Sequence, residues 1–231
     1  MVHRLAGPTS DGRGFCWPGR VGGLSLVRRA ARPGADEIEW HPEEGKIDSG
    51  ALEGVDAVVH LAAENIDGRW TEEKKRRLIE SRVTGTRLIA STLASLASRP
   101  EVLVSASASG IYGADRGDER LDESSALGTD FLGSMGTQWE AAAEPARIAG
   151  IRVAHPRFGL ILGRGGALQR MLPFFRLGLG GRLGSGRNWM SWISLEDAVR
   201  AVRFAIEHRA LEGPFNTVAP EPVTNATFTE E

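Results

Sequence analysis

The sequence is poor in cysteine, tyrosine, lysine and long apolar runs, and each shortage excludes a class of protein or chemistry. Its one cysteine, Cys16, cannot form an internal disulfide, and no Cys/His cluster suggests a zinc or other metal site. There is one tyrosine, Tyr112, and only three lysines, Lys46, Lys74 and Lys75. No apolar run approaches the ~18–20 residues of a transmembrane helix, and the first twenty residues lack the apolar core of a secretory signal. We therefore expect a soluble, cytoplasmic protein with no membrane partner.

The overall composition is ordinary for a soluble globular protein. Of 231 residues, 41% are hydrophobic and 25% are charged, and the net charge of −2 gives no reason to expect a nucleic-acid partner. Glycine is abundant, with 29 residues and no collagen-like period, which indicates tight turns and close backbone approaches.

The order of apolar and amphipathic segments predicts alternating strands and helices. Residues 55–63 are a continuous apolar run, as in a strand buried on both faces of a parallel sheet. Thr71 is suited to cap a helix that runs to Pro100. Further along we expect strands at 101–109, 151–158 and 215–219 and helices at 139–148 and 195–208. This alternation predicts an α/β fold with a doubly wound parallel sheet, whose ligands bind beyond the carboxyl ends of the strands.

Residues 1–25 do not fit the start of such a sheet. A phosphate-binding turn needs an apolar strand, closely spaced glycines and a helix. Here Gly12, Gly14 and Gly19 follow no apolar strand, and Pro18 stands where the helix should continue. The stretch is either a damaged phosphate loop or an irregular segment unrelated to phosphate.

From residue 26 onward the chain resembles the atypical "epimerase family" group of the extended short-chain dehydrogenase/reductases. The matching segments include Leu26-Val-Arg-Arg, His60-Leu-Ala-Ala-Glu-Asn, Ser81-Arg-Val-x-Gly-Thr, Ser105-Ala-Ser-Ala, Trp139-Glu-Ala-Ala-Ala, Leu162-Gly-Arg-Gly-Gly-Ala and Asn216-x-Val-Ala-Pro. The resemblance implies a Rossmann-type NAD(P)-binding domain over 1–163, atypical at 1–25. Residues 164–231 would then hold substrate-side elements with the last Rossmann helix and strand. Family members begin with a glycine-rich turn and continue well beyond residue 231, so we expect an altered N-terminus and a truncated small domain.

The catalytic pair usual in this superfamily, Tyr-x-x-x-Lys, is missing. The resemblance places Leu132 and Gly136 at its two positions, and Tyr112 is followed four residues later by Arg116. Ser107, with Ser105 as runner-up, takes the place of the substrate-orienting hydroxyl; the alternative is a serine that bonds local backbone. The family's Tyr-Gly at 112–113 usually has a structural role.

The resemblance also implies a set of cofactor-binding residues. Arg28 and Arg29 follow the second strand, where arginine suits the 2′-phosphate of NADP and an acidic residue suits NAD. NADP is therefore favoured and NAD stays open, the alternative being two exposed arginines. The remaining candidates are Leu61, Ala62 and Ala63 after the 55–63 run, Arg82 on the following helix, and Pro156 and Arg157 at a later strand end. His60 is expected to be a packed core residue.

A glycine-rich segment at 178–186 predicts a substrate-side lid. The segment contains Arg182 and is followed by Arg187, Trp189, Met190 and Trp192. The arginines could bind an anionic group, and the tryptophans could stack on a ring. The alternative is a surface loop that its tryptophans anchor to the core.

Together these features predict an NADP(H)-binding oxidoreductase or epimerase-like protein that acts on a small polar or sugar-like substrate. The alternatives are a non-catalytic dinucleotide-binding sensor or scaffold, and a nonfunctional fragment. Substrate identity, reaction direction and oligomeric state stay open.

Overall fold

The computed structural model describes residues 2–4, 22–32, 34–163, 166–177, 180–182 and 184–230. The chain divides into two compact units. The first comprises residues 1–105 and 138–154, and the second comprises residues 106–137 and 155–231. The expected functional division at residue 163 stays a prediction.

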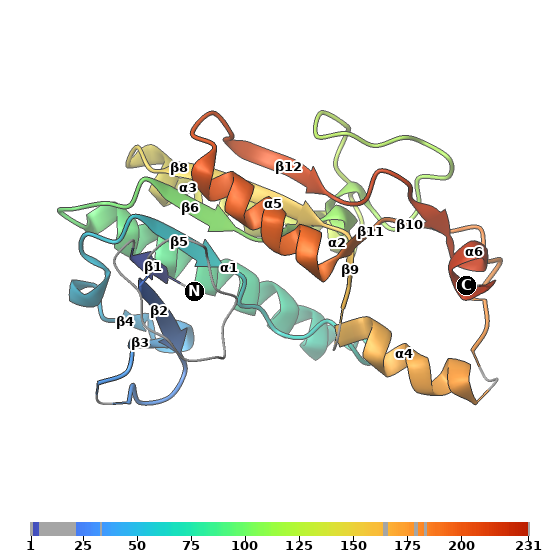
Figure 1. Ribbon diagram of the computed structural model, residues 1–231, viewed down its shortest axis with the longest axis horizontal. Coiled ribbons are helices and arrows are strands. Elements are labelled where there is room, and N and C mark those ends of the chain that lie inside the picture. The colour runs from blue at the N-terminus through green and yellow to red at the C-terminus, as the bar shows by residue number, and fades with distance from the viewer. Residues whose placement is uncertain are drawn as a thin grey trace. The chain divides into compact units, whose positions relative to one another are not determined.

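The first unit is built on one sheet. Its strands are β1 (Val2–Arg4), β2 (Gly22–Val27), β3 (Glu37–His41), β4 (Lys46–Ile47), β5 (Ala57–His60), β6 (Val102–Ser105) and the beginning of β8 (Arg152–Phe158). They follow the order β8-β6-β5-β1-β2-β3-β4 (Figure 1). The pairs β2/β3, β5/β6 and β6/β8 are parallel, which confirms the predicted parallel α/β sheet. The three-residue β1, where we expected no strand, pairs antiparallel with β2 and β5.

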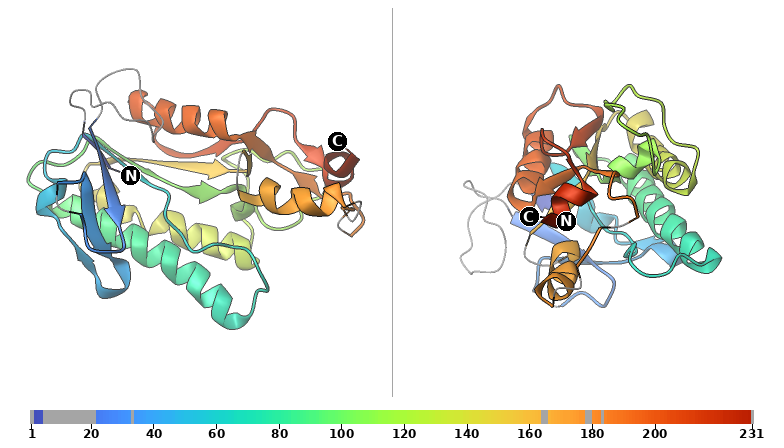
Figure 2. Two further views of the ribbon diagram at one scale, coloured as in Figure 1. Left: turned by 60° about the horizontal axis from the view of Figure 1, so that its bottom comes forward. Right: turned by 90° about the vertical axis from the view of Figure 1, so that its right-hand side faces the viewer.

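Helix α1 (Glu72–Ser95) covers one face of this sheet together with α3 (Glu144–Ile148) (Figure 2, left). As predicted, Thr71 caps α1: its hydroxyl accepts a hydrogen bond from the Lys74 N–H at 3.2 Å. Leu78, Ile89 and Leu93 recur at helical spacing and are fully buried. Every residue of β5 and β6 is buried as well, as expected of strands covered on both faces. Two short 3-10 helices, η1 (Pro42–Glu44) and η2 (Gly50–Leu52), complete this unit.

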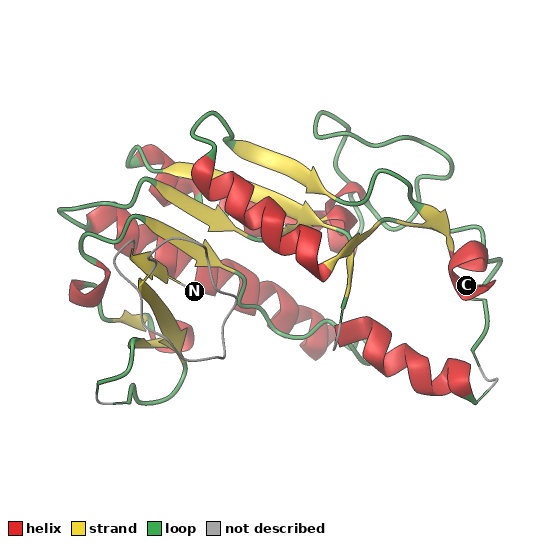
Figure 3. Ribbon diagram, viewed as in Figure 1, coloured by secondary structure: helices red, strands yellow, loops and turns green. Residues whose placement is uncertain are grey.

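The second unit combines short strand pairs with helices. Its strands are β7 (Ser107–Ala108), the end of β8, β9 (Leu160–Leu162), β10 (Trp189–Met190), β11 (Trp192–Ser194), β12 (Gly213–Thr217) and β13 (Val223–Thr224). Its helical segments are η3 (Ser109–Tyr112), the beginning of α2 (Phe131–Ala141), α4 (Gly166–Arg176), α5 (Leu195–Glu207) and α6 (Asn225–Glu230) (Figure 3). Strand β8 pairs in parallel with β7 and also borders β12, β11 pairs in parallel with β9, and β10 pairs antiparallel with β13.

One helix differs from its prediction. In place of a single helix at 139–148, the structure has α2 from Phe131 and a separate α3. Helix α2 begins early because the Asp130 carboxylate accepts the Gly133 N–H at 2.8 Å and caps the first turn. The helix breaks before Pro145, which lacks an N–H group and is tolerated only in a first helical turn.

Within the described ranges no helix is long and apolar enough to cross a bilayer. The same residues contain no group of three or more His, Cys, Asp or Glu side chains able to hold a metal ion.

Candidate functional site

The end of β2 carries a cluster of arginines around one carboxylate. Glu37, the first residue of β3, accepts hydrogen bonds from Arg29 (Nη1 to Oε2, 2.9 Å) and Arg32 (Nη2 to Oε1, 2.7 Å). The Arg32 backbone N–H reaches the same carboxylate at 3.0 Å. The Glu37 side chain is 8% exposed, and its arginine partners hold the pKa of this carboxyl far below its usual value. Arg28 contacts the exposed Glu43.

The predicted arginine pair is therefore part of a larger cluster. Three guanidinium groups and two carboxylates, Glu37 and Glu43, leave a net charge of +1. Arg29 and Arg32 are at least half exposed, and each guanidinium has five N–H donors, so both keep donors for a further anion. The sequence prediction missed Arg32 and Glu37. The parallel pairing of β2 with β3 places Glu37 opposite Ser25, and the chain after β2 brings Arg29 and Arg32 to its carboxylate, a contact that the order of residues does not reveal.

The end of β5 presents apolar residues to solvent. Leu61, Ala62 and Ala63 are exposed, and Leu61 keeps 53% of its surface. His60, one residue earlier, is buried and makes an edge contact with the Trp40 ring at 5.9 Å. Burial lowers the pKa of His60 to about 4, so it is neutral at pH 7 and belongs to the core, as its position in the strand suggested.

Arg82, on α1, lies behind this segment. Its Nη1 donates to the carbonyl oxygens of Glu64 at 3.2 Å and Leu78 at 3.1 Å, and the side chain is buried. The guanidinium carbon lies 5.0 Å from the centre of the Trp139 ring, and the Trp139 Nε1 donates to the Thr86 hydroxyl at 3.1 Å. Burial lowers the pKa of Arg82, although the negative charge of Glu64 opposes this. Arg82 thus anchors the loop after β5, while its contact with a cofactor stays a prediction.

In the second unit, the predicted residues lie along β7 and β8. Ser107 is buried and stands opposite Arg157 in the β7–β8 ladder. Pro156 is buried, and Arg157 keeps 3% of its surface. The Arg157 Nη1 donates to the Tyr112 hydroxyl at 2.9 Å, and this hydroxyl donates to the Asn216 Oδ1 at 2.7 Å. The Tyr112 phenol is thus engaged on both sides, which agrees with a structural role. Direct cofactor or substrate contact by Ser107, Pro156 and Arg157 stays a prediction.

The tryptophans of the predicted lid are bonded to protein atoms. The Trp189 Nε1 donates to Asp118 Oδ1 at 2.8 Å, and the Trp192 Nε1 donates to the Glu221 carbonyl at 3.0 Å. Strand β10 is also paired with β13. These contacts favour the anchoring alternative for the two tryptophans. Residues 178, 179 and 183 of the lid, like the candidate phosphate-loop residues Gly12, Gly14, Pro18 and Gly19, lie outside the described residues.

Packing explains why one position of the missing Tyr-x-x-x-Lys pair is glycine. A Cβ atom at Gly136 would lie 2.8 Å from Cβ of Ile111, closer than side-chain atoms can approach. A lysine at this position would therefore force α2 away from η3, and no lysine ammonium can take the usual place here without such a shift.

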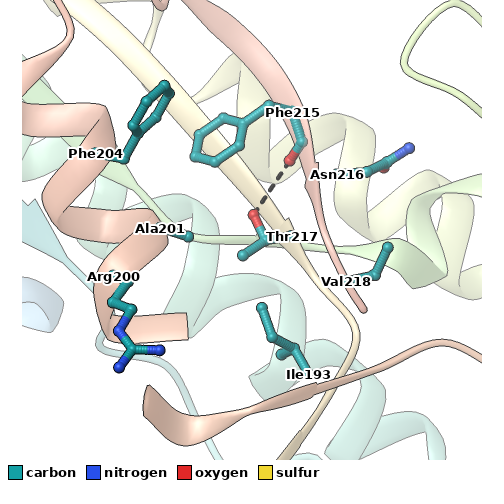
Figure 4. Close-up of a pocket in the computed structure, with 8 residues that line it drawn as sticks. All are labelled: Ile193, Arg200, Ala201, Phe204, Phe215, Asn216, Thr217 and Val218. Carbon is teal, nitrogen blue, oxygen red and sulfur yellow. Dashed lines mark hydrogen bonds between the residues drawn. The ribbon is translucent and has the colours of Figure 1, made fainter. Parts of the chain in front are cut away.

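A groove of about 370 Å³ lies between α5 and β12 (Figure 4). Its lining is mostly apolar and includes Phe204, Phe215 and Val218. Its one charged residue, Arg200, is paired with Asp197 at 2.8 Å. The groove contains none of the predicted site residues.

Comparison with known proteins identifies the family. The sequence model described as "NAD dependent epimerase/dehydratase family" matches residues 47–217. The epimerase family protein Mb2239 of Mycobacterium bovis is 47% identical over 208 residues, which are 89% of this chain and 68% of that protein. The chain belongs to the NAD-dependent epimerase/dehydratase family.

Two solved structures of this kind support the assignment. A nucleoside-diphosphate sugar epimerase from Corynebacterium glutamicum is 40% identical with a TM-score of 0.77, over 90% of this chain but only 43% of that one. The human epimerase family protein SDR39U1, solved with NADPH, is 33% identical with a TM-score of 0.77, over 90% of this chain and 69% of that one. The resemblance to atypical extended reductases and the Rossmann-type sheet are thereby confirmed. This chain spans about two thirds of the mycobacterial and human relatives and less than half of the corynebacterial one.

Proposed function

We propose that the chain binds a nicotinamide dinucleotide, with NADP(H) preferred over NAD(H), and acts as an oxidoreductase or epimerase on a small polar or sugar-like substrate. The observation that carries this proposal is the cluster of Arg28, Arg29 and Arg32 at the end of β2. In doubly wound sheets the adenosine ribose lies at this place, and guanidinium groups match the geometry of a 2′-phosphate. The human relative solved with NADPH supports this preference.

The described residues fit such a cofactor at two strand ends. The arginine cluster offers a net positive charge and free N–H donors, and the small side chains of Ala62 and Ala63 allow close approach to the backbone after β5. When bound, the nicotinamide group supplies a hydride donor or acceptor. The chain's own contribution is to bind and orient, with Ser107 as the hydroxyl that orients the substrate.

Nucleotide titrations test the cofactor preference. We expect NADPH to bind more tightly than NADH, and Arg29→Gln or Arg32→Gln to weaken NADPH about tenfold or more while NADH changes little, because only NADPH carries the 2′-phosphate. Arg87→Gln, an exposed arginine on α1, is the control for the change of charge. Equal affinities for the two nucleotides in the unaltered chain would exclude the preference.

A second candidate function is binding of the dinucleotide without turnover. It is favoured by the Tyr112 phenol, which Arg157 and Asn216 engage, and by the packing of Gly136 against Ile111. Screening NADPH oxidation across carbonyl compounds and nucleotide sugars separates the two candidates. Turnover that Ser107→Ala abolishes supports the enzyme, whereas nucleotide binding without any turnover supports the sensor or scaffold.

A further inference from the structure

Three side chains of α1 converge on one residue of the loop after β5. Lys74, Ser81 and Arg82 stand at positions i, i+7 and i+8, a spacing that places them on one face of a helix. Helix α1 runs back along β5 (Figure 1), and hydrogen bonds from this face reach the loop that joins the two elements. All three side chains bond Glu64, and we call this arrangement the Glu64 clamp.

The clamp holds Glu64 at three separate points. The Glu64 backbone N–H donates to the Ser81 hydroxyl at 3.1 Å, and its carbonyl oxygen accepts from the Arg82 Nη1 at 3.2 Å. Its carboxylate accepts from the Lys74 Nζ at 2.8 Å, and this pair lowers the pKa of Glu64. A backbone bonded at both its N–H and its C=O loses most of its freedom, although it belongs to a loop.

The residues just before the clamp are apolar and exposed. Leu61, Ala62 and Ala63 connect the buried end of β5 to Glu64, so both ends of this short segment are fixed. A segment that is fixed before binding saves the ligand the entropic cost of ordering it. Apolar surface at such a place is what a ring or ribose face would cover.

The charge beneath the segment points to an anionic ligand. Arg82 is only 7% exposed, and within the described ranges no carboxylate oxygen lies within 4 Å of it and its Nε has no partner. Glu64 already pairs with Lys74, so the clamp carries a net charge of +1. A net positive charge that is partly buried acts more strongly on a nearby anion than the same charge in water.

We propose that Lys74, Ser81 and Arg82 are positioning residues that hold Leu61–Ala63 as a preformed platform for the bound dinucleotide. This inference rests on the proposed function. It reassigns Arg82 from direct cofactor contact to action through the Glu64 backbone. Lys74 and Ser81, which the sequence prediction did not single out, join it.

The test pairs each clamp residue with a matched control on the same helix. Lys74→Met is compared with Lys75→Met, because Lys75 pairs with Glu72 and the change of charge is the same. Ser81→Ala is compared with Ser95→Ala, whose hydroxyl donates to the Thr92 carbonyl. No substitution of Arg82 is needed, because the loss of this buried side chain could prevent folding. Ser81→Ala removes only one oxygen atom and tests the same clamp.

Two readouts are measured on the full chain. Without nucleotide, amide hydrogen exchange at Glu64 should quicken at least threefold in Ser81→Ala, because its N–H loses its acceptor. NADPH affinity should fall about threefold to tenfold in both clamp variants, as expected for one lost hydrogen bond or ion pair, and less than twofold in the controls. Thermal midpoints should match between each variant and its control.

The outcomes separate this inference from the proposed function. Unchanged exchange at Glu64 in Ser81→Ala would overturn the clamp, and faster exchange with unchanged NADPH affinity would overturn the platform. If the unaltered chain binds neither NADPH nor NADH, the proposed function fails and the platform with it, which is seen before any variant is made.

Discussion

The segment after β5 and the surroundings of Tyr112 differ in what their side chains leave available for a ligand. After β5, polar side chains fix the backbone of Glu64 from behind, while apolar Leu61 in front keeps 53% of its surface. Around Tyr112, side chains from distant segments are bonded in series: the Tyr112 hydroxyl accepts from buried Arg157 and donates to half-buried Asn216. The first region is ordered and still offers surface, whereas the second has its bonding groups engaged inside the protein. We infer that the exposed apolar surface of the first region is available to a ligand, whereas the bonds of the Tyr112 hydroxyl in the second region stabilise the fold.

The largest effect should come from removing the buried charged residue that bonds Tyr112. Arg157→Met leaves the Tyr112 hydroxyl without its charged donor and should lower the free energy of unfolding by roughly 3 kcal/mol. Urea unfolding measures this loss, and Arg120→Met, at an exposed arginine, is the control. A loss below about 1 kcal/mol together with weaker NADPH binding would place Arg157 in the ligand-contacting region and break the comparison.

Buried His60, the last residue of β5, should make the stability of the fold depend on pH. The pKa of His60 falls to about 4 in the folded chain from about 6.5 when unfolded, so the unfolded state binds the proton first as pH drops. Its contribution is complete above pH 6.5 and is lost progressively toward pH 4, by up to about 3 kcal/mol.

Urea unfolding of the unaltered chain and of His60→Leu at pH 7 and pH 4.5 measures this loss. The variant should lack the part of the pH dependence that His60 contributes. Equal pH dependence in both proteins would show that His60 is protonated without cost.

A smaller loss should follow from removing only the hydroxyl of the network. Tyr112→Phe deletes one hydrogen bond accepted from Arg157 and one donated to Asn216, which should cost about 1–2 kcal/mol of unfolding free energy. NADPH affinity should not change. Intact stability with lost turnover would instead assign the Tyr112 phenol a chemical role and move it into the functional region.

The smallest stability effect is expected in front of the clamp. Leu61→Ser should alter the free energy of unfolding by less than about 0.5 kcal/mol, because the side chain is exposed. NADPH affinity should fall about threefold to tenfold, because apolar contact is lost. Leu127→Ser, at another exposed leucine, should change neither quantity. A drop in stability without a drop in affinity at Leu61 would reverse the assignment of the two regions.

Much of the fold was predictable because its signals are local. The apolar run at 55–63 and the periodic apolar residues after Thr71 predicted β5 and α1, and both are present. The early start of α2 was missed, since Gly133 and Gly136 weaken the helical pattern and the cap at Asp130 replaces that lost support.

Less of the candidate site was predictable. Arg28 and Arg29 were identified from their place after a strand, but their carboxylate partners come from the next strand and its turn. Arg82 was singled out, yet its bond to the Glu64 carbonyl depends on how the loop returns over α1. Spacing along the chain gives no information on such contacts.

The sequence by itself determined the alternation of strands and helices, the family, and the absence of a Tyr-x-x-x-Lys pair, because each depends on residue type and short-range order. Only the tertiary structure decided which polar side chains bond each other. The Tyr112 hydroxyl bonds Asn216, 104 residues away in the sequence, and Arg157, 45 residues away. The Glu37 carboxylate forms ion pairs with two arginines. A buried hydrogen-bonding group needs a partner wherever folding brings one, and that choice is made by packing in three dimensions.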